Sequence, residues 1–156
     1  MERDEKLTKV HVTFENGGGE SMWAREIEGD LFALKNLPFF AFGLNFDDVV
    51  RAPLVGRMRE VQAVARVSGH RTLRVLFGEH VTQAEQKRYL DALRELGGSF
   101  ERGTKRLVAL DTPPDAQYDV IVALLDRWAL HGELVFETCE QRVAGSFDDG
   151  AVNDAA

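Results

Sequence analysis

The residue types best suited to chemistry stand together at residues 68–72, where the sequence reads Ser-Gly-His-Arg-Thr. A histidine exchanges protons near neutral pH, and an arginine beside hydroxyl groups can bind an anion. We therefore consider a small-molecule or proton-transfer site centred on His70. The alternative, which we favour, is that Ser68 and Gly69 form a turn and that His70 is a polar anchor holding the two halves of the chain together. The candidate contacts are Ser68, His70, Arg71 and Thr72.

A second polar group consists of Asn45, Asp47 and Asp48. Paired carboxylates can bind a metal ion or act as acid and base. Adjacent strand residues point to opposite faces, so the two aspartates converge only if a turn separates them. We expect a turn before a strand, in which Asn45 or Asp47 bonds its own backbone. Asn45 and Asp48 are kept as candidate binding residues.

The segment 36–46 contains four phenylalanines in eight residues, interrupted by a glycine and preceded by a proline. This composition suits neither a regular helix nor a long strand. We expect the phenylalanines mainly in the core, because large aromatic side chains are usually buried. Two of them exposed together would instead mark a partner site. The candidates for such a site are Trp23, Asn36, Phe39 and Phe40.

The remaining motifs predict neither metal nor cofactor. The glycines at 17–19 join two expected strands and lack the pattern of a phosphate-binding loop. Cys139 is the single cysteine, which excludes a disulfide framework, and the histidines show no metal-ligand spacing. No cofactor is expected.

The elements that must position these residues fall into two groups. Alternating apolar residues predict short strands at 9–14, 21–27, 31–34, 47–52 and 58–67, with turns at 16–19, 28–30 and 53–56. Five short strands with glycine-rich turns predict a small antiparallel, barrel-like β subdomain at 8–69.

The second half changes pattern. A strand at 72–77 is followed by a helix that opens with a capping box at Thr82 and Glu85 and ends at Gly97. A hairpin at 99–110, a helix opened by residues 113–115 and a strand at 134–138 complete the order β-α-β-β-α-β. The sequence thus predicts an α+β protein with a ferredoxin-like subdomain at 70–139. Residues 1–7 and 140–156 are expected to be disordered.

Composition narrows the classes of function. The 156 residues carry 19 basic and 26 acidic side chains, a net charge of −7, which argues against non-specific nucleic-acid binding. No signal peptide or membrane span is expected, and one cysteine suits a reducing compartment. We therefore expect a cytoplasmic protein without membrane partners.

Three sequence blocks resemble a known family: residues 16–23, residues 35–39 running on to 48–51, and residues 68–74. They are similar to a bacterial family of small proteins catalogued only as a domain of unknown function. The resemblance spans about residues 8–139, implies a bacterial and cytoplasmic origin, and implies no catalytic role.

Three functions are carried forward. The leading hypothesis is a non-catalytic binding or regulatory protein that acts through a protein partner, such as an inhibitor, adaptor or immunity-like protein. The alternative is a small-molecule-binding protein or enzyme with a site between the two halves around His70. The least favoured is nucleic-acid binding by an arginine stripe on the small barrel. The arginines of that stripe are Arg51, Arg57, Arg59, Arg66, Arg71 and Arg74.

Overall fold

The computed structural model describes residues 6–14 and 17–140 and divides them into two compact units. The first unit runs to His70, and the second is Arg71–Cys139. Each unit has its own hydrophobic core and its own sheet. The described residues form eleven strands and two helices, so the protein is of the α+β class.

The first unit is a seven-stranded sheet. Its strands are β1 (Leu7–Thr13), β2 (Gly19–Glu28), β3 (Leu31–Leu34), β4 (Val49–Arg51), β5 (Leu54–Val55), β6 (Met58–Glu60) and β7 (Ala63–Arg66). They lie in the order β5-β6-β1-β2-β3-β4-β7. All neighbours are antiparallel except β1 and β6, which are parallel.

The sheet curls because one stretch of chain bonds to two distant strands. The amide of Val61 donates to the carbonyl of His11 at 2.8 Å, and the next amide, of Gln62, donates to Arg51 at 2.9 Å. β6 therefore lies on β1 while β7 lies on β4. Alternate residues of the strands point into the curled sheet and form its core. These include Val10, Val12, Met22, Ala24, Phe32, Leu34, Val50 and Val64.

Several sequence-based boundaries in this unit were wrong. Residues 58–67 form two strands rather than one, because the chain changes neighbours at Val61. The expected turn at 53–56 contains the short strand β5, and the expected disorder at 1–7 ends before Leu7, which begins β1. The remainder of that disorder prediction, at 1–5 and 141–156, lies outside the described residues.

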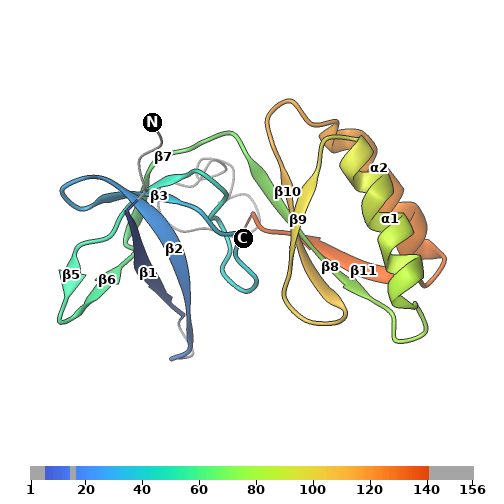
Figure 1. Ribbon diagram of the computed structural model, residues 1–156, viewed down its shortest axis with the longest axis horizontal. Coiled ribbons are helices and arrows are strands. Elements are labelled where there is room, and N and C mark those ends of the chain that lie inside the picture. Colours follow the sequence, from blue (N-terminus) through green and yellow to red (C-terminus); the bar gives the residue numbers. More distant parts are fainter. Residues whose placement is uncertain (1–5, 15–16, 141–156) are drawn as a thin grey trace, which may run out of the picture. The chain divides into compact units, whose positions relative to one another are not determined.

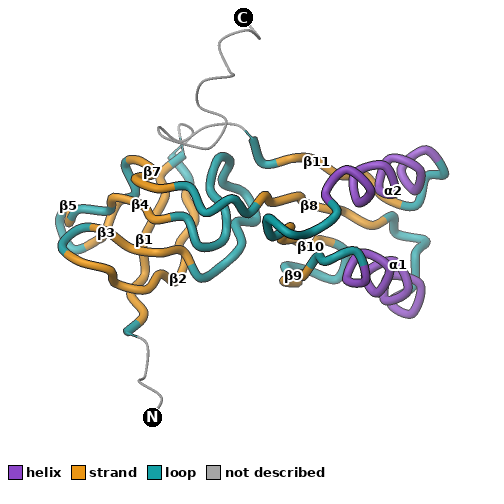
Figure 2. The backbone as a smooth tube through the Cα atoms, turned by 90° about the horizontal axis from the view of Figure 1, so that it is seen from above, coloured by secondary structure: helices purple, strands orange, loops and turns teal. Residues whose placement is uncertain are grey.

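The second unit has two helices on one face of a four-stranded sheet (Figures 1 and 2). Its elements are β8 (Arg71–Phe77), α1 (Gln83–Glu95), β9 (Ser99–Arg102), β10 (Leu107–Thr112), α2 (Tyr118–Leu130) and β11 (Leu134–Thr138). The strand order is β11-β8-β10-β9, and every neighbouring pair is antiparallel. Neither helix in this part of the chain has the length and apolar character needed to cross a bilayer.

The two helices begin differently. At α1 the capping box is confirmed: the amide of Glu85 donates to the Thr82 hydroxyl at 3.1 Å, and the Thr82 amide donates to the Glu85 carboxylate at 3.0 Å. The bond from the Thr82 amide lowers the pKa of Glu85. α2 was expected to open at 113–115 but begins at Tyr118, and its N-cap residue, Gln117, makes no side-chain capping bond.

The capping box gives a stability prediction. Thr82→Ala leaves the Glu85 amide without its acceptor and should lower the free energy of unfolding by about 1 kcal/mol. Thr82→Ser keeps the hydroxyl and should stay close to wild type. Urea denaturation followed by circular dichroism measures both variants, and equal losses in the two would contradict the capping role.

Candidate functional site

The centre of the first unit's polar cluster is Asp48, which is fully buried just before β4. One carboxylate oxygen accepts a hydrogen bond from the Ser68 amide at 2.9 Å, and the other accepts one from the Asn45 amide at 2.9 Å. Burial raises the pKa of Asp48 above the usual aspartate range, while these bonds oppose the shift. The carboxylate therefore joins the loop after β3 to the turn after β7.

Ser68 and His70 complete this cluster. The Ser68 hydroxyl donates to the carbonyl of Phe46 at 2.6 Å and accepts from the His70 amide at 3.1 Å. The His70 ring lies 5.4 Å from the Phe46 ring, measured between centroids. Four of the candidate residues, Asn45, Asp48, Ser68 and His70, thus come together. The contacts described here are those of a turn, and all of them lie within the first unit.

A turn is present at residues 45–48, as expected, although the strand expected at 47–52 begins only at Val49. The carboxylate that accepts from the backbone of this turn is that of Asp48. The Asp48 amide donates to the Asn45 carbonyl at 3.1 Å. Asp47 has a φ of 65°, the one positive value among non-glycine residues in the described ranges. An aspartate tolerates this conformation better than most residues. The turn directs the Asp48 side chain inward. The Asp47 carboxylate does not join it there and forms an ion pair with Lys35.

Glu20 organises the phenylalanine-rich segment, and the sequence analysis missed it. Its carboxylate accepts hydrogen bonds from three consecutive amides: Phe39 at 2.7 Å, Phe40 at 3.1 Å and Ala41 at 2.8 Å. Successive amides that point to one place form an anion-binding nest, and here the protein fills the nest with its own side chain. No local motif signals this contact, because Glu20 lies on β2, far along the chain from the segment.

The phenylalanines are not the core of this segment, and that expectation was wrong. The fully buried apolar residues there are Leu37, Ala41 and Leu44. Phe40 is 62% exposed, and the other three phenylalanines are half-buried. The alternative expectation, two phenylalanines exposed together, is therefore not met either.

Trp23 and Asn36, the other two candidates, are joined through the backbone. The Trp23 amide donates to the Asn36 side-chain oxygen at 2.8 Å, and the Lys35 amide donates to the Trp23 carbonyl at 2.8 Å. The Trp23 ring is 44% exposed, and the Lys9 ammonium lies 5.2 Å from its centroid. The start of the loop is therefore fixed to the middle of β2.

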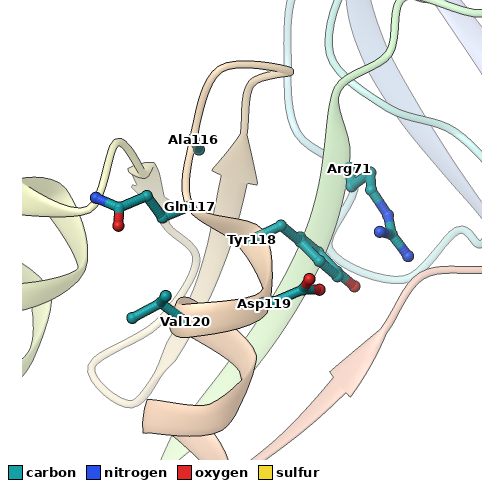
Figure 3. Close-up of a pocket in the computed structure, with 6 residues that line it drawn as sticks. All are labelled: Arg71, Ala116, Gln117, Tyr118, Asp119 and Val120. Carbon is teal, nitrogen blue, oxygen red and sulfur yellow. The ribbon is translucent and has the colours of Figure 1, made fainter.

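The last two candidates, Arg71 and Thr72, belong to the second unit. Thr72 is buried, and the Arg71 guanidinium lies over the Tyr118 ring with its carbon 3.6 Å from the centroid. Tyr118 points toward Arg71 from the first turn of α2, beside an open cavity of about 450 Å³ (Figure 3). The cavity is lined by Arg71, Ala116, Gln117, Tyr118, Asp119 and Val120.

The chemical capacity of the first unit's cluster follows from its bonds. Both oxygens of Asp48 are bound to backbone amides and the Glu20 carboxylate is bound to three, so both groups hold the chain in place. In the described ranges no three histidine, cysteine, aspartate or glutamate side chains are grouped to hold a metal ion. The arrangement fixes one loop conformation and displays Phe40.

Comparison with known proteins defines the family. Residues 20–136 match the model of a family described as a domain of unknown function (DUF4265), so the chain belongs to that family. The chain is also similar to a crystal structure titled as a hypothetical protein from Neisseria gonorrhoeae. That similarity has a TM-score of 0.72 at 18% identity and covers 88% of this chain and 97% of the other. At this identity it concerns the fold alone. No curated protein matches the chain.

Asp48 gives a prediction about stability and pH. Asp48→Ala leaves the buried amide of Asn45 and the half-buried amide of Ser68 without acceptors, and should lower the free energy of unfolding by about 3 kcal/mol. Folding raises the pKa of this carboxyl, so the folded protein holds the proton more tightly than the unfolded chain does. The contribution of Asp48 to stability should therefore fall as pH rises from the ordinary aspartate pKa through the raised one.

Asp48→Asn is the matched control, because the amide cannot change charge. Urea denaturation at several pH values gives the free energy of unfolding of wild type and of Asp48→Asn. The difference between these two free energies should become smaller as pH rises. A gap that widens over this range would contradict the sign of the shift.

Glu20 gives a prediction about local order. Glu20→Ala removes the acceptor of three amides and should greatly speed hydrogen exchange at Phe39, Phe40 and Ala41. Exchange measured by NMR should stay slow at the Ser68 amide, which Asp48 holds. Unchanged exchange at residues 39–41 would mean that Glu20 does not hold the loop.

Proposed function

We propose that this protein is a non-catalytic binding or regulatory protein that acts through a protein partner. The observation that carries the proposal is Phe40, whose side chain is 62% exposed on a loop with a fixed backbone. Phenylalanine, like tyrosine and tryptophan, is enriched in the buried cores of protein interfaces relative to the rest of the protein surface.

The fixed loop supports this proposal because ordering a loop opposes binding. Glu20 holds the amides on both sides of Phe40, and Asp48 holds the end of the same loop. The loop has therefore already lost its conformational entropy in the free protein, and the binding of a partner would not have to order it. Leu37 and Leu44 of the same segment are buried, whereas Phe40 is its most exposed aromatic residue.

The fold enters the proposal as a scaffold. We propose that the second unit is of the ferredoxin-like type, which is supported by its element order and by the strand order β11-β8-β10-β9. This fold carries many unrelated functions and does not by itself favour one. A cytoplasmic location is part of the same proposal and is supported by the single, buried cysteine.

A small-molecule site is the second candidate, and the cavity beside Arg71 favours it. The guanidinium and the Tyr118 ring could hold a flat anionic group. Asp119 lines the same cavity, and its negative charge weakens the attraction for an anion. The cavity is also open to solvent, so we place this function second.

Nucleic-acid binding by the arginine stripe has the least support. Arg59 forms an ion pair with Asp30 at 2.8 Å, and Arg74 forms one with Glu137 at 2.9 Å. Arg71 and Arg74 belong to a different unit from the other four arginines. Two of the six arginines are thus paired with carboxylates, and the chain as a whole is acidic, which opposes binding to a phosphate backbone.

Photo-crosslinking from position 40 tests the proposed function. A photoreactive phenylalanine analogue replaces Phe40 in the full chain, which is then expressed and irradiated in its native cells. We expect one discrete adduct with a protein. With that protein purified, Phe40→Ala should weaken binding by roughly tenfold or more.

Leu130→Ala is the matched control. This leucine is 88% exposed at the end of α2, in the other unit. It should leave the affinity unchanged. An absence of any adduct from position 40, or equal losses in the two variants, would refute binding through this loop.

A further inference from the structure

The hairpin of β5 and β6 exposes three large apolar side chains within five residues. Leu54 is 59% exposed, Val55 is 53% exposed and Met58 is 43% exposed. The hairpin forms one edge of the seven-stranded sheet and projects from it (Figure 1). Such a concentration of exposed apolar residues at an edge strand carries a risk of aggregation unless it serves a purpose.

The exposed residues occupy both faces of the hairpin. Leu54 and Val55 are adjacent on β5, so their side chains point to opposite faces. Val55 lies opposite Met58 across the two-residue turn, and these two share a face. A flat partner surface would cover only one of the faces. A partner that buries all three side chains must surround the hairpin, as a cleft does.

The base of the hairpin is held rigidly. The Arg59 guanidinium donates to the Asp30 carboxylate at 2.8 Å and to the carbonyl of Ala52 at 3.3 Å, and it lies over the ring of Phe32. The Ala52 amide also donates to the Asp30 carbonyl at 2.8 Å. The hairpin is thus fixed before any partner arrives.

The charge of the hairpin is opposite to that of the protein. Between Val49 and Arg59 the sequence has three arginines and no acidic residue, in a chain of net charge −7. Arg59 is paired with Asp30, whereas Arg51 and Arg57 are exposed and form no ion pair with another residue in the described ranges. Arg57 lies in the turn itself, at the extreme tip.

We propose that this hairpin is a docking element that inserts into a cleft of a protein partner. The cleft has apolar walls that contact Leu54, Val55 and Met58, and a carboxylate at its floor that pairs with Arg57. A bilayer surface fits less well, because Arg57 at the tip would have to enter the hydrocarbon first, where a charge is costly. The net negative charge of the chain also opposes approach to an anionic membrane.

The inference rests on the proposed function only in requiring a protein partner. The hairpin and the loop that carries Phe40 are separate segments of the first unit, so their crosslinks can be read independently. An adduct from position 40 without one from position 55 would overturn the hairpin proposal and leave the proposed function standing.

The experiment places a photoreactive phenylalanine analogue at Val55 of the full chain in its native cells. The protein captured is purified, and its affinity is measured with unlabelled variants. Arg57→Glu should weaken binding by at least about 30-fold, and Arg57→Lys, which keeps the charge, should weaken it less. Leu54→Ser should also weaken binding, whereas Arg88→Glu on the exposed surface of α1 should leave it unchanged.

The changed positions, 54, 55, 57 and 88, are all exposed, so each variant should keep the wild-type thermal unfolding midpoint. The proposal is overturned if position 55 gives no protein adduct or if Arg57→Glu binds as tightly as wild type. It is also overturned if the full chain co-sediments with phosphatidylserine vesicles and Arg57→Glu abolishes that binding, because the bilayer is then the occupant.

Discussion

The first unit depends on the buried carboxylate of Asp48. A buried charge is costly unless its oxygens are satisfied, and here the amides of Asn45 and Ser68 satisfy both. The carbonyl of the same residue accepts from the Leu34 amide, which continues the pairing of β3 toward β4. Three segments that are distant in sequence therefore meet at one residue. The loop between them has little freedom, and the shape of the surface around it follows from that constraint.

Glu20 plays a similar part, because its one side chain accepts hydrogen bonds from three amides of an irregular loop. Loops that lack ladder hydrogen bonds must satisfy their backbone groups in another way. In this unit the carboxylates of Asp48 and Glu20 do so. Polar residues that look reactive in a sequence are used here to hold irregular backbone.

Local patterns in the sequence predicted much of the fold. The capping box at Thr82 and the alternation at Val10 and Val12 depend on neighbours within a few residues, and both are present. The curl of the sheet could not be predicted, because it depends on Val61 and Gln62 bonding to strands far away. Glu20 was missed for the same reason. In the candidate site, the turns that hold Asn45, Asp48 and Ser68 follow from local sequence. The exposure of Phe40 was only the less favoured alternative, because it depends on the distant Glu20.

The parallel pairing of β6 with β1 has a consequence for the order in which the sheet can assemble. β1 can pair with β2 as soon as both have left the ribosome, but its other edge waits for Arg59 and Glu60. β4 likewise waits for β7. Closing these long loops costs chain entropy, which slows the step. One stretch, 58–66, therefore covers both open edges of the nascent sheet. Until it has left the ribosome, the free edges of β1 and β4 can pair with strands of other unfolded chains.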